Sequence, residues 1–253
     1  MIKDILSNSV SKQEKQLAVL IDPDKTQPAD LFGLIKNANA CNVDYFFVGG
    51  SHVQHDRIDD VIIELKSHSE LPVVIFPGSN KQISKHADAI LLLSLISGRN
   101  PEYLIGQHVN AAFDLRESGL EILPTSYLLV DGGKVTSVAY VSNTIPIPRD
   151  KKDLVVGTAL AGKMLGQRVT YIDTGSGALD SVPLDIISSV KVEVGLPLII
   201  GGGIRTPEQA WQICNAGADV VVVGNAFEED PELLFDIKSA VKSSTHANYS
   251  NLK

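Results

Sequence analysis

Short runs rich in β-branched residues alternate with helix-like segments along almost the whole chain, and this alternation constrains the fold most strongly. Eight runs have strand character, at 17–21, 43–48, 73–76, 89–93, 122–130, 169–173, 196–200 and 220–223. Helical patterns follow most of them, at 29–40, 58–68, 101–116, 154–165, 184–194, 207–216 and 231–241. Because buried parallel strands are continuously apolar and are joined by helices, we predict an α/β fold, a (β/α)8 TIM barrel.

Two segments depart from this repeat. Residues 79–86 are short and polar, so we expect a weak or missing third helix. Asp-Gly-Gly-Lys at 131–134 has the character of a hairpin turn and predicts an extra strand at 135–141. No linker rich in Pro, Gly and Ser divides the chain. We therefore predict one barrel domain over 1–253, with an N-terminal extension at 1–15 and a flexible tail at 243–253.

Composition excludes several classes of protein. Hydrophobic residues make up 44% of the 253 and charged residues 21%, which suits a large core. A net charge of −8 argues against a nucleic-acid partner. The most apolar stretch, 89–96, is too short to cross a bilayer, so we expect no transmembrane segment and a cytoplasmic location. The two cysteines, Cys41 and Cys214, lie in apolar helical patterns and are predicted to be buried free thiols.

Three glycine-bearing turns follow the last three strand-like runs: YIDTGSGA at 171–178, LIIGGGIRT at 198–206 and VVVVGNA at 220–226. A glycine lets the backbone N–H approach an anion closely, and barrels of this type hold phosphate after strands seven and eight. Ser176 adds a hydroxyl, and Thr206-Pro207-Glu208 has the chemistry of a helix start. The turns together predict one phosphate cradle, although any one of them alone reads equally well as a tight turn.

Acidic residues follow the first and sixth strand-like runs. The carboxylate of Asp22 is expected at the barrel mouth, where it suits Mg²⁺ shared with substrate phosphates. Ser51 follows the second run. It is either a second metal ligand or a turn residue. Asp173 adjoins the phosphate cradle and is expected to bind substrate or accept a proton. Tyr171 lies two residues earlier, so its side chain is expected on the same side of the strand. Its predicted role is either to bind a hydroxyl or to fill the barrel.

Other polar residues give weaker signals. Asp24 and Lys25 take part in the site or form a solvated turn, and the sequence leaves both readings open. The six histidines show no zinc-ligand spacing, and no Ser-His-Asp arrangement is evident. Residues 91–105 are rich in Leu and Ile and contain Tyr103, so they are a candidate wall for an apolar groove or ordinary barrel packing.

Seven motifs together resemble the geranylgeranylglyceryl phosphate synthase family, including its bacterial heptaprenylglyceryl phosphate synthase relatives. They are LIDPDK, FVGGS, FPGS, SLISGRNPEYLIGQHV, YIDTGSGA, GGGIRT and VVGNA, and they extend from about Leu17 to Phe227. GGGIR alone is shared by many phosphate-binding barrels, whereas its combination with LIDPDK and SGRNPEYLIGQHV is specific.

The resemblance implies a Mg²⁺-dependent prenyltransferase. Such an enzyme joins the 3-hydroxyl of sn-glycerol 1-phosphate to a polyprenyl diphosphate, here expected to be geranylgeranyl diphosphate, and releases diphosphate with an ether lipid precursor. It implies that Asp22 and Ser51 hold Mg²⁺, that Asp22 and Asp173 are catalytic, and that the chain is a homo-oligomer, a dimer or larger. The implied glycerol phosphate ligands are Tyr171, Asp173, Thr174, Gly175, Ser176, Gly177, Gly202, Gly203, Gly224 and Asn225.

Two positions depart from the family pattern. Many members have Glu where this chain has Asp173, so the acid is kept with a shorter reach. One branch has a phosphate-binding Lys where this chain has Leu20, which places the chain in the other branch. A sugar-phosphate isomerase or synthase on the same barrel would explain the cradle but neither LIDPDK nor NPEYLIGQHV. A non-catalytic phosphate sensor would leave Asp22 and Asp173 without a task.

Overall fold

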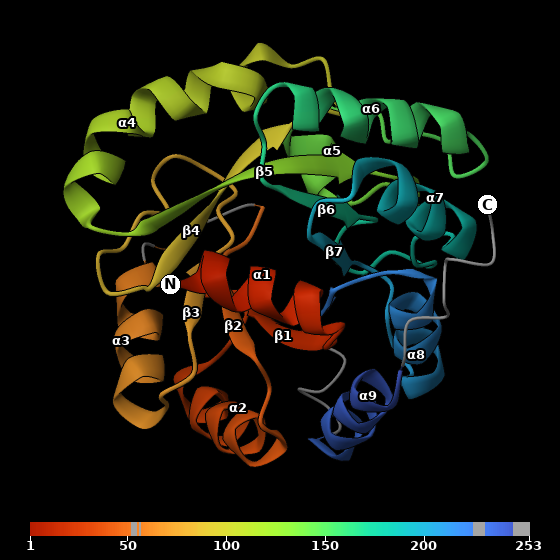
Figure 1. Cartoon of the computed structure of the whole chain (residues 1–253). Helices are drawn as coiled ribbons and strands as arrows, with labels where there is room; N and C mark the ends of the chain where they lie inside the picture. The colour runs from red at the N-terminus through yellow and green to blue at the C-terminus, as the bar shows by residue number, and fades with distance from the viewer. Residues whose placement is uncertain (52–54, 56, 225–230, 245–253) are drawn as a thin grey trace.

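Eight parallel strands close into a barrel in the order of the chain (Figure 1). The computed structural model describes residues 1–51, 55, 57–224 and 231–244. The strands are β1 (Gln16–Ile21), β2 (Tyr45–Val48), β3 (Val73–Ile75), β4 (Ala89–Leu95), β5 (Glu121–Leu129), β6 (Val169–Asp173), β7 (Leu198–Gly201) and β8 (Val220–Val223). The barrel closes where β8 pairs with β1, Gln16 lying opposite Val220. The predicted TIM barrel is therefore confirmed.

Helices surround this barrel on the outside, except α1, which lies across one end (Figure 1). Among the described residues they are α1 (Ile2–Lys12), α2 (Pro28–Cys41), α3 (Ile58–His68), the π-helical turn η1 (Glu102–Gly106), α4 (Gln107–Ser118), α5 (Ser137–Val141), α6 (Lys152–Met164), α7 (Leu184–Val194), α8 (Pro207–Ala216) and α9 (Pro231–Ser243). No helix joins β3 to β4 in the described chain. The helix that would follow the third strand, which was predicted to be weak or missing, is therefore missing.

The predicted hairpin strand at 135–141 is wrong. Residues Ser137–Val141 form α5, and the turn before it is held by the Gly133 N–H, which donates to Asp131 Oδ1 at 2.9 Å. The physical reason lies in β5, which pairs with β4 on one edge and with β6 on the other. A strand returning along β5 would find no free edge, so the short apolar segment packs as a helix instead.

Side chains alternate between the inside and the outside of the barrel. In β1, Ala18 and Leu20 belong to the interior cluster, whereas Leu17, Val19 and Ile21 pack against the helices outside. This period of two places Asp22, the next residue inward after Leu20, at the mouth formed by the carboxyl ends of the strands. The same alternation places Asp173 above Tyr171 on β6.

Helix α1 closes the opposite end of the barrel, across which it lies in Figure 1. Its Ile2 and Leu6 are buried in the interior cluster of the barrel. The carboxylate of Glu121 accepts hydrogen bonds from the backbone N–H groups of Ile2 and Lys3, which satisfies free donors at the start of the helix. With this end closed, the carboxyl ends of the strands are left as the open face.

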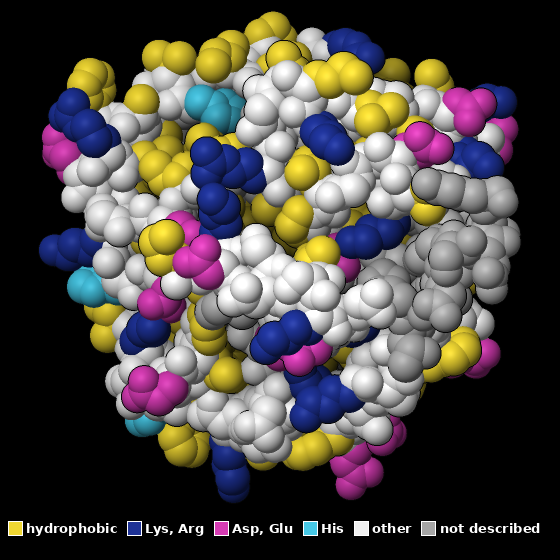
Figure 2. All heavy atoms as spheres, viewed as in Figure 1, with side chains coloured by type: hydrophobic (Ala, Val, Ile, Leu, Met, Phe, Trp, Pro, Cys, Tyr) yellow, Lys and Arg dark blue, Asp and Glu magenta, His cyan; other side chains and the backbone are white. Residues whose placement is uncertain are grey.

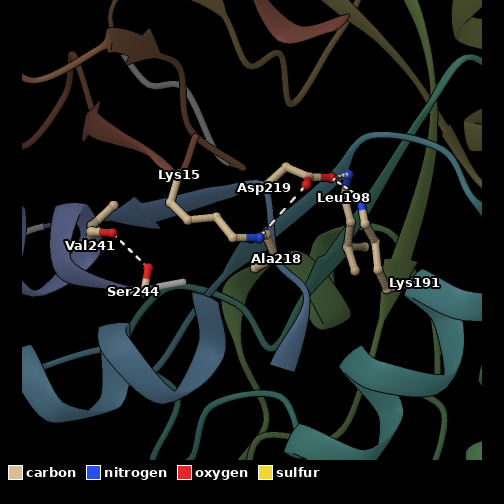
Figure 3. Close-up of polar contacts among 7 residues, drawn as sticks. All are labelled: Lys15, Lys191, Leu198, Ala218, Asp219, Val241 and Ser244. Atoms are coloured by element: carbon tan, nitrogen blue, oxygen red, sulfur yellow. Dashed lines mark hydrogen bonds and ion pairs between the residues drawn. The ribbon is translucent and has the colours of Figure 1, made fainter. Parts of the chain in front are cut away.

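A buried ionic cluster ties the beginnings of β7, β8 and β1 together (Figure 3). Asp219 Oδ2 accepts from the Leu198 N–H at 2.8 Å and from Lys191 Nζ, and Lys15 Nζ lies 3.8 Å from Asp219 Oδ1. Lys15 Nζ also donates to the Ala218 carbonyl at 2.6 Å. Burial lowers the pKa of Lys15 to about 8, against the opposing effect of the Asp219 charge. The cluster lies at the closed end of the barrel, away from the mouth.

Smaller sequence predictions are also settled by the described residues. Cys41 and Cys214 are buried free thiols, as expected. No described helix combines the length and apolar character needed to cross a membrane. The predicted tail falls mainly on 245–253, which lie outside the described residues. Charged side chains of both signs are scattered over the face shown in Figure 2.

Candidate active site

A pocket of about 660 Å³ opens at the barrel mouth, and we call it the polar pocket after its acidic and hydroxyl side chains. It brings together Asp22, Ser51, Asp173 and Ser176, which come from the ends of β1, β2 and β6. These four were predicted as site residues from separate parts of the sequence. They share one pocket because the carboxyl ends of all the strands meet at this face.

The Asp22 carboxylate is fixed by its surroundings. Its Oδ1 accepts from the Asp24 N–H at 3.2 Å, and its Oδ2 forms an ion pair with Lys25 Nζ at 2.8 Å. A Cβ at residue 50 would lie 2.9 Å from Asp22 Oδ1, so a side chain there would force the carboxylate to move. Asp24 Oδ1 in turn accepts from the His55 N–H at 3.1 Å, so Asp24 holds the loops together rather than facing the pocket.

The glycine turns after β6 and β7 lie against each other. The Thr174 N–H donates to the Gly201 carbonyl at 3.3 Å, and Gly202 has a φ of +83°. A Cβ on Gly202 would lie 2.6 Å from Asp173 Oδ1, so both conformation and space require glycine there. Thr206 caps α8 as expected, its Oγ1 accepting from the Gln209 N–H at 3.2 Å.

The hydroxyl of Thr174 is buried beside Gly202 in this cradle. Thr174 is 1% exposed, and its Oγ1 has no hydrogen-bond partner among the described residues. A buried hydroxyl without a partner is costly, and an anion held between the two turns would satisfy it. Gly224, from the third predicted turn, follows β8, and no atom of the described residues lies within 4 Å of where its side chain would stand. Asn225 lies outside the described residues.

Asp173 is the most strongly held acid of the mouth. Its Oδ1 accepts from the Gly175 N–H at 2.8 Å, and its Oδ2 accepts from the Tyr127 hydroxyl at 2.7 Å. Burial raises the pKa of the Asp173 carboxyl, while hydrogen bonds from Tyr127, Gly175 and Thr174 oppose that rise. A carboxylate with a raised pKa is a better proton acceptor than an exposed one.

Three aromatic rings form a layer beneath the mouth. Phe76 stacks on Tyr171 with ring centroids 4.9 Å apart, and Tyr127 meets both edge to face, at 5.7 Å from Phe76 and 5.5 Å from Tyr171. Burial raises the pKa values of both tyrosines well above the ordinary range, and the Asp173 charge adds to this rise. Both phenols are therefore neutral hydrogen-bond donors at neutral pH. Tyr171 thus fills the barrel, one of its two predicted roles.

An apolar pocket of about 720 Å³ adjoins the polar one. It lies between β4 and α4, next to the segment where no helix joins β3 to β4. Figure 2 shows hydrophobic side chains lining a recess beside α4 (Figure 2). Of the wall predicted at 91–105, Leu92, Leu93, Leu95 and Tyr103 line this pocket, whereas Leu91 is packed inside the barrel.

The two pockets are neighbours that share a wall. Both are lined by Ser51, Pro77, Gly78, Leu93, Tyr127 and Val138. An acceptor held beside Asp173 and an apolar chain lying along α4 would therefore meet at this shared wall. The arrangement suits the joining of a polar molecule to a long apolar one.

Two residues of the mouth were missed in the sequence. Tyr127 faces Asp173 because β5 and β6 pair with Tyr127 opposite Tyr171, a register that the long run at 122–130 does not reveal. Lys134 Nζ lies 3.5 Å from where a Cβ of Gly177 would stand, so it brings a positive charge beside the cradle. Its position was hidden by the wrong hairpin prediction.

Comparisons with known proteins agree with the resemblance drawn from the motifs. The model of the PcrB family matches residues 9–242. The geranylgeranylglyceryl phosphate synthase of Chitinophaga pinensis is 50% identical over 234 residues, covering 92% of this chain and 93% of that protein. Its counterpart in Spirosoma linguale is 49% identical over 228 residues, covering 90% and 92%.

A solved structure extends this agreement to the fold. The (S)-3-O-geranylgeranylglyceryl phosphate synthase of Thermoplasma acidophilum, crystallised with its substrate sn-glycerol-1-phosphate, superposes with a TM-score of 0.88 at 36% identity, covering 94% of this chain and 98% of that one. The resemblance drawn from the motifs is confirmed: the chain belongs to the PcrB family.

Proposed function

We propose that this protein is a geranylgeranylglyceryl phosphate synthase, which transfers a geranylgeranyl group from its diphosphate to the 3-hydroxyl of sn-glycerol 1-phosphate. The observation that carries the proposal is the wall, including Tyr127, that is shared by the pocket of Asp22 and Asp173 and the apolar pocket along α4. The names of its relatives and the ligand of the Thermoplasma acidophilum enzyme point the same way.

Glycerol phosphate fits the polar pocket. Its phosphate would lie between the turns at Gly175 and Gly202 and accept from the Thr174 hydroxyl, which has no partner among the described residues. Ser176 lines the same pocket, and Lys134 supplies charge in a chain that lacks the lysine of the other family branch at Leu20. The glycerol hydroxyl would then lie toward Asp173.

The prenyl chain fits the apolar pocket. The lining residues of the helical segment run from Tyr103 to Leu115, which at the α-helical rise is about 18 Å. An extended geranylgeranyl chain has a comparable length. Ala111 and Leu115 lie toward one end of this segment, while Ser51 and Gly78 lie where the pocket meets the mouth. The diphosphate would therefore be held beside Asp22.

Magnesium fits this place only together with diphosphate. Among the described residues no group of three or more His, Cys, Asp or Glu side chains is arranged to hold a metal. Asp22 and Ser51 offer one carboxylate and one hydroxyl, and Mg²⁺ characteristically combines so few protein ligands with substrate phosphates. Lys25 already pairs with Asp22, so this carboxylate favours a cation. When bound, Mg²⁺ would neutralise charge on the departing diphosphate.

The remaining chemistry is carried by the chain's own residues. The glycerol oxygen bonds to C1 of the prenyl chain as the bond from C1 to diphosphate breaks, and the electron pair of that bond leaves with diphosphate. Asp173 takes the hydroxyl proton, which its buried environment favours. The apolar walls of the groove keep water from the reacting carbon. A sugar-phosphate isomerase or synthase would have no use for such a groove.

Two further features belong to the proposal. Large apolar side chains are exposed on α5, α6 and the loop between them, including Tyr140, Ile145, Leu154, Met164 and Leu165, which supports a homo-oligomer. A cytoplasmic location agrees with the absence of a membrane-spanning helix in the described chain. Light scattering of the purified protein would test the first, because a monomer mass would contradict it.

Binding of both substrates at once tests the proposed function. Calorimetry with sn-glycerol 1-phosphate and an unreactive geranylgeranyl thiodiphosphate, each titrated with and without the other in Mg²⁺, should show two compatible sites. Mutual exclusion of the two ligands, or no binding of the prenyl analogue, would contradict the proposal.

A further inference from the structure

Tyr127 occupies the point at which the acceptor and donor pockets meet. It is the residue that lines both pockets and also bonds to the acid of the mouth. Its hydroxyl donates to Asp173 Oδ2 at 2.7 Å, and its ring is packed by Phe76 and Tyr171. Tyr127 is 4% exposed, so the phenol cannot turn away without disturbing this packing.

The hydrogen bonds of Asp173 explain why such a partner is needed. The backbone N–H of Gly175 holds Oδ1 toward the phosphate turn. If the Tyr127 hydroxyl were removed, the carboxylate would keep its backbone hydrogen bonds from Gly175 and Thr174, but Oδ2 would lose its side-chain partner at the mouth. The Tyr127 hydroxyl fixes Oδ2 on the side where the two pockets join.

We infer that Tyr127 is a positioning residue for prenyl transfer: its hydroxyl orients the Asp173 carboxylate toward the acceptor hydroxyl, at the wall shared by the two pockets. This inference rests on the proposed function and adds a residue to it. The proton of the acceptor passes to Asp173, and Tyr127 keeps its own proton throughout.

The variant Tyr127→Phe removes the hydroxyl and keeps the ring in its aromatic layer. Tyr45→Phe is the matched control, because the Tyr45 hydroxyl is also buried in the barrel and donates to Gln16 Oε1 at 3.1 Å, but at the closed end. Both variants lose one oxygen atom and one hydrogen bond. Differences between them therefore report on the position of Tyr127 rather than on the loss of a buried hydroxyl.

Loss of a hydrogen bond to a charged group predicts a fall in kcat of about 10- to 100-fold for Tyr127→Phe. The KM for sn-glycerol 1-phosphate should change little, because the phosphate cradle is intact. The acid limb of the kcat/KM profile should move to higher pH, since Tyr127 lowers the pKa of Asp173. Among the described residues, the other titratable groups around Asp173 are Tyr171, which stays neutral across this range, and Asp22 and Lys25, which line the same pocket.

The experiment measures kcat, KM, the pH profile and Tm for the unmodified protein and both variants. The inference predicts a kinetic loss in Tyr127→Phe alone, at a Tm close to that of Tyr45→Phe. Unchanged kcat and an unmoved acid limb in Tyr127→Phe, with an active unmodified protein, would overturn the inference. An equal kinetic loss in both variants would also overturn it. Absence of transfer by the unmodified protein would overturn the proposed function itself.

Discussion

The carboxylate of Asp22 lies directly against Gly50: a Cβ on residue 50 would lie 2.9 Å from Asp22 Oδ1. At the ends of β1 and β2, the side chain of Asp22 therefore packs against the backbone of Gly50 and faces the pocket. This close approach, together with the ion pair to Lys25, sets where the carboxylate points.

The variant Gly50→Ala should displace that carboxylate. Because the added methyl group has no room, Asp22 must rotate or the β2 loop must move, and we expect kcat to fall by at least about 10-fold. Steady-state kinetics check this, with Gly33→Ala as control, since a Cβ at Gly33 meets nothing within 4 Å. Equal activity of the two variants would contradict the assigned role of Gly50.

The variant Asp22→Asn should abolish metal-dependent turnover and leave the fold intact. The amide keeps the shape of the side chain but removes the charge that holds Mg²⁺ at the diphosphate. Activity measured over a range of Mg²⁺ concentrations, with circular dichroism to verify folding, checks this. Near-normal activity in Mg²⁺ would show that Asp22 is not the metal ligand.

The variant Lys134→Met should weaken the grip on glycerol phosphate. The substitution removes a positive charge beside Gly177 and with it a charge-assisted hydrogen bond to the phosphate. We therefore expect KM for sn-glycerol 1-phosphate to rise by about 10-fold, with a smaller change in kcat. Lys36→Met removes an exposed lysine on α2 and serves as the control. A KM that stays the same in both variants would remove Lys134 from the site.

The lowered pKa of Lys15, at the closed end of the barrel, predicts that the free energy of unfolding depends on pH. Its pKa is lowered from 10.5 to about 8, so between these values the unfolded chain binds a proton that the folded chain does not. The free energy of unfolding should therefore rise with pH through this window, by about 3 kcal/mol from this group, and be insensitive to Lys15 below it.

Chemical denaturation at pH 7 and pH 10 checks this as a difference between the unmodified protein and Lys15→Met. The difference is needed because burial raises the pKa values of Cys41 and Cys214 to about 11, which lowers stability above pH 9 in both proteins. Parallel pH dependence in the two proteins would contradict the assignment to Lys15.

The fold followed from the sequence because each strand is a short apolar run with a helix after it, and even the missing third helix was visible as a polar segment. The hairpin at 135–141 was wrong because local turn chemistry says nothing about whether β5 has a free edge. That property arises only when the barrel closes.

The site was predictable where it depends on strand ends, as for Asp22, Ser51 and Asp173, because the carboxyl ends of the strands meet at one face. It was not predictable where it depends on register or loop path. The pairing of β5 with β6 decides that Tyr127 reaches Asp173, and the path of the loop before α5 decides that Lys134 reaches Gly177.

Transfer of label tests the central claim most directly. Radiolabelled sn-glycerol 1-phosphate is incubated with the protein, Mg²⁺ and prenyl diphosphates of several lengths, and the mixture is extracted with organic solvent. We predict that label moves to the organic phase, most rapidly with geranylgeranyl diphosphate, and that Asp173→Ala greatly slows this transfer. Label that stays in the aqueous phase with every donor, although both substrates bind, would contradict prenyl transfer as the function of the joined pockets.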